Sequence, residues 1–150
     1  AITASVATLE ATFNTFIEDL GLVKEEVELI EKTDLLSKYW WLLRLAGKKP
    51  FERSSEPAQS MKDLLTLRNY SVHYRPRWDD AAHEAQRLEK MFRARNIPVS
   101  PLFPEDMPFF PYRCCSYAYA EWAMQTVERF LNDFAQRMEV EIKWLESSVN

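Results

Sequence analysis

The fold is decided by the longest periodic stretch of the chain, residues 113–146, which reads RCCSYAYAEWAMQTVERFLNDFAQRMEVEIKWLE. Charged and amide side chains such as Glu121, Arg129 and Asp133 fall outside its mostly apolar stripe. A period near 3.6 residues predicts one long amphipathic helix, about 50 Å at 1.5 Å per residue. A helix of that length would overhang a small bundle or pack on a second subunit. The stripe consists of Tyr119, Trp122, Thr126, Phe130, Phe134, Met138, Ile142 and Leu145.

Upstream of this stretch, prolines, glycines and capping residues divide the chain into further helices. Thr33 and Asp34 are suited to cap a helix start, and Pro57 suits a first helical position. Residues 22–32 predict only one or two amphipathic turns, and residues 48–56 predict a loop. The expected helices are 3–20, 34–46, 57–74, 79–94 and, as the last, 113–146.

A proline-rich segment, residues 95–111, precedes the last helix and holds five of the eight prolines. Its aromatic residues Phe103, Phe109 and Phe110 are expected to pack on the bundle. A connection of this length is either a strap that crosses the bundle or an interaction surface.

Composition agrees with an all-α fold. The 150 residues are 47% hydrophobic and include only two glycines, whereas tight hairpins require glycine. We therefore expect a single domain over residues 1–150. It would be an up-and-down bundle of about five helices, with a long proline-rich connection before the last helix.

Several features favour a cytoplasmic protein. The chain has no run of 18 apolar residues that would span a membrane, and it does not open on a secretory signal. Its two cysteines, Cys114 and Cys115, are neighbours, and a disulfide between neighbours is strained. Neither cysteine has metal-ligand spacing, so they suggest a reducing compartment.

The chemically distinctive segment is LLTLRNYSVHYRPRW, residues 64–78. Arg68 shares a helical stripe with apolar neighbours, and a buried cation is costly unless it is paired or faces a cleft. Asn69 and His73 lie four residues apart, on one helix face. Arg75 and Arg77 complete a cationic run of ten residues without an acid, although the net charge is −4. Fixed cations beside a histidine suit a phosphate-bearing ligand.

Other interpretations of these residues remain open. The presence of Arg68 on an apolar stripe would be equally explained by an ion pair with Glu10. His73 would be explained by its place at a helix C-terminus, where a basic side chain is favourable. His83 is interpreted as a solvated surface residue. Because no Cys or Asp stands at zinc-site spacing from either histidine, no metal site is expected.

The run Arg68-Asn69-Tyr70-Ser71-Val72-His73 resembles the Arg-x4–6-His motif of the HEPN superfamily. The longer phrase from Leu67 to Pro76, with Val72-His73-Tyr74, is similar to a segment of uncharacterised bacterial HEPN-like proteins. Glu10 and Asn14 match the Glu-Ala-x-x-Asn of their first helix, and 116–134 resembles their final helix. The resemblance spans about residues 9–138, and the proline-rich connection departs from it.

The resemblance implies a helical homodimer with facing motifs, active as a metal-independent endoribonuclease without a cofactor. Arg68, Asn69 and His73 would form the catalytic site. Tyr74, Arg75 and Arg77 would bind substrate, and Glu10 and Asn14 would support the site from behind. A second hypothesis is a non-catalytic dimeric module that binds a nucleotide, RNA or a protein partner. The complete motif favours the first, and the acidic net charge favours the second.

Overall fold

The structure is a computed structural model that describes residues 1–73 and 80–142. Within these residues the regular structure is entirely helical, which confirms the predicted all-α class. The helices in chain order are α1 (Ile2–Leu20), α2 (Lys24–Glu31), α3 (Leu35–Leu45), α4 (Ala58–His73), α5 (Asp80–Arg93), the π-helical turn η1 (Phe109–Arg113) and α6 (Tyr117–Met138). The segment at 22–32, expected to form one or two amphipathic turns, contains α2, which is about two turns long.

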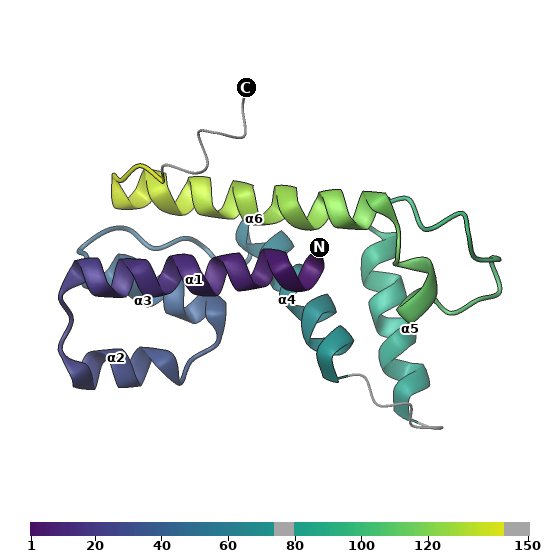
Figure 1. The fold of residues 1–150 in the computed structure, drawn as a ribbon, viewed down its shortest axis with the longest axis horizontal. Helices are drawn as coiled ribbons and strands as arrows, with labels where there is room; N and C mark the ends of the chain where they lie inside the picture. Colours follow the sequence, from purple (N-terminus) through teal and green to yellow (C-terminus); the bar gives the residue numbers. More distant parts are fainter. Residues whose placement is uncertain (74–79, 143–150) are drawn as a thin grey trace.

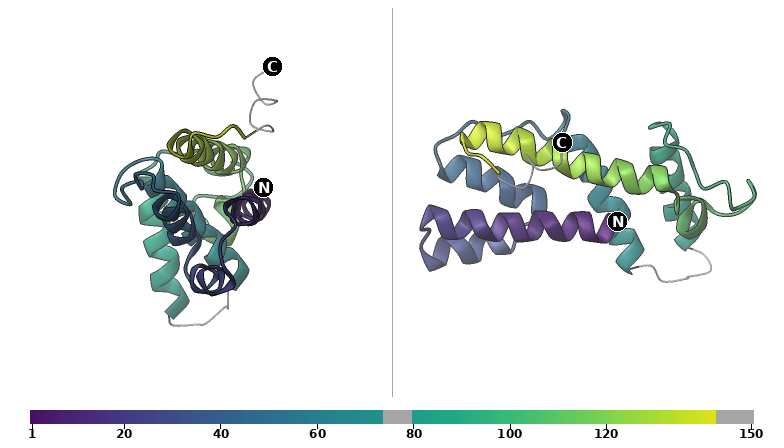
Figure 2. Two further views of the ribbon diagram at one scale, coloured as in Figure 1. Left: turned by 90° about the vertical axis from the view of Figure 1, so that its left-hand side faces the viewer. Right: turned by 45° about the horizontal axis from the view of Figure 1, so that its top comes forward.

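Helices α1 and α6 lie side by side and run in the same direction (Figure 1). Seen end-on, α1, α2, α3 and α6 are viewed close to their axes, whereas α5 stands across them (Figure 2, left). The described part of the chain contains six α-helices where about five were expected, and α5 stands across the others, so the up-and-down order is not confirmed. The central pair is parallel, because the path through α5 and the proline-rich connection returns the chain to the end where α1 begins.

Short polar caps explain where two of the helices begin. The Asp34 carboxylate accepts a hydrogen bond from the Ser37 amide at 3.0 Å, so α3 starts at the predicted cap. The Ser116 hydroxyl accepts from the Tyr119 amide at 3.2 Å and starts α6. The predicted start at residue 113 was therefore too early, because η1 occupies 109–113 and ends before this cap.

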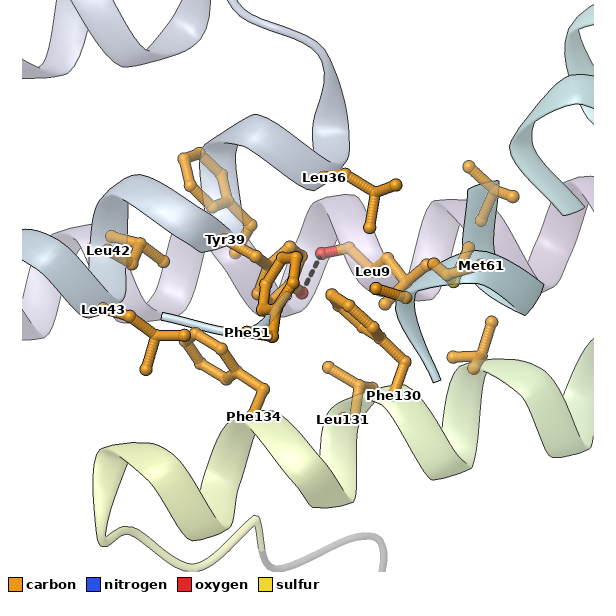
Figure 3. Packing of buried hydrophobic residues seen from close by; sticks show 14 of the residues in the cluster. Leu9, Leu36, Tyr39, Leu42, Leu43, Phe51, Met61, Phe130, Leu131 and Phe134 are labelled. Atoms are coloured by element: carbon orange, nitrogen blue, oxygen red, sulfur yellow. Dashed lines mark hydrogen bonds between the residues drawn. The ribbon is translucent and has the colours of Figure 1, made fainter. Parts of the chain in front are cut away.

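The larger apolar core is centred on Tyr39 of α3, which is fully buried (Figure 3). Its ring meets Phe130 and Phe134 of α6 edge-to-face, with ring centroids 5.2 and 4.8 Å apart. Burial raises the pKa of the Tyr39 hydroxyl, which therefore keeps its proton and donates it to the Leu9 carbonyl of α1 at 2.7 Å. One side chain thus ties α3 to α1 and α6 and satisfies its own polar atom.

A second apolar cluster joins the end of α4 to α5, η1 and the start of α6. Phe92 of α5 stacks on Phe109 at 5.8 Å, and Phe110 meets Tyr70 edge-to-face at 4.8 Å. The expectation that Phe109 and Phe110 pack on the bundle is therefore confirmed. Trp122 packs against both clusters and links them.

Helix α6 ends at Met138 and not at residue 146 as predicted. Glu139 adopts a left-handed conformation with φ of 59°, and the amides of Glu139 and Val140 bond to the carbonyls of Gln136 and Ala135. This is the hydrogen-bonding pattern of a Schellman motif, which usually has glycine at this position. The helix is therefore about 33 Å long, so its length no longer argues for a dimer. Residues 143–146 lie outside the described residues.

Candidate functional site

The last two turns of α4 position the three residues of the motif. Asn69 and His73 are exposed, and the Arg68 side chain is 26% exposed. Arg68 Nη1 donates a hydrogen bond to Asn69 Oδ1 at 3.1 Å. This bond leaves the Asn69 amide nitrogen as an outward donor and fixes the orientation of the amide relative to the guanidinium. Arg68 and Asn69 thus form one polar unit.

Arg68 also forms an ion pair with Glu10 of α1, with 3.7 Å between Nη2 and Oε1. The pair is longer than a hydrogen bond, and the Glu10 side chain is 51% exposed, so it contributes at most about 1 kcal/mol. Arg68 Nε is buried without an acceptor among the described residues, which is unfavourable for a cation. The predicted pair with Glu10 therefore exists, but it satisfies only part of the guanidinium.

A pocket of about 330 Å³ opens beside this pair, between α1, the start of α3 and α4. Arg68 and Asn69 line it and His73 does not, so Arg68 borders a pocket and forms an ion pair at the same time. Its wall is mixed, with three cations, two acids, two threonines and four aliphatic side chains. The remaining lining residues are Val6, Glu10, Thr33, Asp34, Leu35, Leu36, Lys38, Lys62, Leu65 and Thr66.

Asp34 sits at the pocket rim and stays ionised. Burial alone would raise its pKa, but hydrogen bonds from Ser37 and the nearby Arg53 guanidinium outweigh that effect and lower it. The Ser37 hydroxyl also donates to this carboxylate, and Arg53 Nη2 donates to Ser37 Oγ at 3.0 Å. The negative charge of Asp34 is therefore engaged by its own neighbours.

His73 is not among the residues that line the pocket. Its helix face also carries Lys62, Thr66 and Asn69. These residues share a face because their spacings of four, three and four residues each correspond to about one turn of the helix. His73 stands about 6 Å along the helix axis beyond Asn69, one turn outside the pocket. His73 belongs to the last turn of α4, where the helix dipole favours a basic side chain.

The remaining predicted site residues separate into two groups. Asn14 is exposed on α1, one turn after Glu10, and no hydrogen bond joins it to the motif in the part of the chain that the structure describes. Tyr74, Arg75 and Arg77, predicted to bind substrate, lie outside the described residues. His83 is exposed on α5, in agreement with its interpretation as a surface residue.

The two lysines of the pocket, Lys38 and Lys62, were not predicted as site residues. Lys62 could have been found, because it stands seven residues before Asn69 on the same helix. Lys38 could not, because only the packing of α3 against α1 brings it there, with its ammonium 5.3 Å from the Phe13 ring centroid.

Among residues 1–73 and 80–142, no group of three or more His, Cys, Asp or Glu side chains is arranged to hold a metal ion. None of the helices described is both long and apolar enough to cross a membrane.

Comparisons of the chain with protein-family models, with curated proteins and with solved structures found no match.

Proposed function

We propose that the chain is a HEPN-like, metal-independent, cytoplasmic endoribonuclease that acts as a homodimer. One observation supports this most: Asn69 and His73 are both exposed on one face of α4, with Arg68 bonded to Asn69 beside them. A cation, an amide and an acid–base group within six residues are the parts that RNA cleavage needs. The open side of this face leaves room for a strand.

The proposed reaction uses the substrate's own 2′-hydroxyl as the nucleophile. One His73 removes the hydroxyl proton, and the 2′-oxygen forms a bond to the adjacent phosphorus. The bond from phosphorus to the 5′-oxygen then breaks, and an acid protonates the departing oxygen. The products are a 2′,3′-cyclic phosphate and a 5′-hydroxyl end. Arg68 would stabilise the charge that develops on the phosphorane oxygens, and Asn69 would orient one of them.

A dimer would solve a shortage in this chemistry. Each protomer contributes one histidine to the motif face, whereas the reaction needs both a base and an acid. A two-fold axis beside His73 would place the partner's His73 on the other side of the scissile phosphate. The exposure of His73 and of Val72, which is 52% exposed, leaves this end of α4 accessible to a second copy.

The test is an assay with an end-labelled single-stranded RNA and the matching deoxy strand, each with and without EDTA. We expect RNA to be cleaved to products with cyclic phosphate ends, and the deoxy strand to stay intact because it lacks the nucleophile. Activity per protomer should rise with protein concentration, because the complete site needs two chains. Cleavage of the deoxy strand, or complete inhibition by EDTA, would contradict the proposed mechanism.

A second candidate function is a non-catalytic dimeric module that binds a nucleotide, RNA or a protein partner. The observation that favours it is the Arg68–Glu10 pair, because a cation that is already paired is less available to a transition state. RNA that is bound but not cleaved in the same assay would select this function.

A further inference from the structure

The charges around the pocket do not balance. Both of its acids have cationic partners, since Glu10 pairs with Arg68 and Asp34 is held by Ser37 and the Arg53 charge. Its two lysines, Lys38 and Lys62, form no ion pair within 4 Å with any acid among the described residues. Two positive charges are therefore left over, in a pocket on a protein whose net charge is −4.

Four side chains of the wall, Lys38, Lys62, Arg68 and Asn69, carry donor groups. The pocket is bordered by the first residues of α3, Leu35 and Leu36, whose amides precede the first intrahelical bonds, and by the positive end of that helix dipole. The Asn69 amide nitrogen lies on the same wall, whereas the Thr33 hydroxyl donates its proton to the Ile30 carbonyl at 2.7 Å and is not available to an anion. Donors and unbalanced cations around one small hollow are suited to a multiply charged oxyanion.

We propose that this pocket binds a phosphomonoester, held mainly by Lys38 and Lys62. A monoester phosphate carries close to two negative charges at neutral pH, which matches the two lysines left over. The aliphatic side chains Val6, Leu36 and Leu65 would contact the organic part of the ligand. A pocket of 330 Å³ falls at the small end of ligand sites and suits one nucleotide-sized molecule.

This inference rests on the proposed function and assigns a separate step to the same helix face. His73 stands one turn outside the pocket, so cleavage of an internal phosphodiester and binding of a terminal phosphate occupy different places. The phosphate group can come from a free mononucleotide or from the 5′-phosphorylated end of an RNA strand. Both present the same dianion to Lys38 and Lys62.

The test is calorimetric titration of the full chain with AMP, adenosine, inorganic phosphate and dimethyl phosphate. We expect AMP and phosphate to bind, and adenosine and the singly charged diester to bind at least about tenfold more weakly, because each lacks a charge-assisted contact. A 5′-phosphorylated and a 5′-hydroxyl oligonucleotide then identify the source. Preference for the phosphorylated strand assigns an RNA end, and equal affinity assigns a free nucleotide.

The matched variants are Lys62→Gln and Lys24→Gln, both of exposed lysines on helix surfaces. Lys62→Gln should weaken AMP binding about tenfold or more, and Lys24→Gln should leave it unchanged. Equal affinity for AMP and adenosine, no binding of AMP, or equal effects of the two variants would overturn the proposal. Because the titration needs no turnover, AMP binding without RNA cleavage would remove only the ribonuclease, and cleavage without AMP binding only this pocket.

Discussion

Replacement of His73 by alanine is expected to lower the rate of RNA cleavage about 10²–10⁴-fold, because it removes the group that transfers the proton. The fold should survive, since His73 is exposed in the last turn of α4 and alanine is favourable in helices. The measurement is single-turnover cleavage of labelled RNA, with circular dichroism of each variant.

His83→Ala is the matched control, because His83 is the other histidine of the chain and is exposed on α5. Its cleavage rate should equal that of the wild type. If His73→Ala and the wild type cleave equally, the activity belongs to a contaminant, and the non-catalytic function replaces the ribonuclease.

Replacement of Arg95 by methionine is expected to lower the free energy of unfolding, because Arg95 is the cation of a buried ion pair. Arg95 follows α5 and donates to Asp63 of α4 from Nε at 2.8 Å and from Nη2 at 2.5 Å, and to Ser60 Oγ at 2.8 Å. Its guanidinium also lies 5.8 Å from the Trp122 ring centroid. Asp63 is only 6% exposed, so methionine would leave a buried carboxylate without its cation.

Removing one partner of such a buried pair costs about 3 kcal/mol, because the other charge stays buried without compensation. For a chain of this size the melting temperature should fall by about 10 °C. Arg93→Met is the control, because Arg93 is 77% exposed and its pair with Glu89 is on the helix surface. A similar, small change for both variants would show that the Arg95–Asp63 contact does not hold α4 to the segment after α5.

Local sequence patterns were sufficient to predict most of the helices. The stripe that includes Phe13 of α1 and the one that includes Phe130 of α6 both point into the core, because 3.6-residue periodicity reports directly on which face is buried. Asp34 was identified as a cap from its residue type and position, and its hydrogen bond to Ser37 confirms it.

The predicted helix boundaries are wrong where tertiary contacts, and not the local sequence, determine where a helix ends. The end of α6 was missed because Glu139, and not glycine, adopts the left-handed conformation, while Val140 and Ile142 continue an apolar pattern beyond it. Glu139 also forms an ion pair with Lys48 at 2.6 Å, and no local signal indicates a partner 91 positions away.

The candidate site was likewise predicted only in part from the sequence. Arg68, Asn69 and His73 were selected from their residue types, their spacing and the resemblance to the HEPN motif, and the pair between Arg68 and Glu10 was one of the stated alternatives. The pocket was not foreseen, because it forms only where three helices meet. Asp63 was passed over for a similar reason: an acid within a mostly apolar stretch gives no sign that Arg95 will reach it from 32 residues away.

The most direct test of the proposed site is NMR titration of the ¹⁵N-labelled protein with a short single-stranded RNA in EDTA. We expect the backbone amides of Arg68, Asn69 and His73, and the side-chain amide of Asn69, to shift together and to saturate. Shifts confined to the start of α6 and the proline-rich connection, around Leu102 and Tyr117, with the motif unchanged, would contradict the assignment of function to this face of α4.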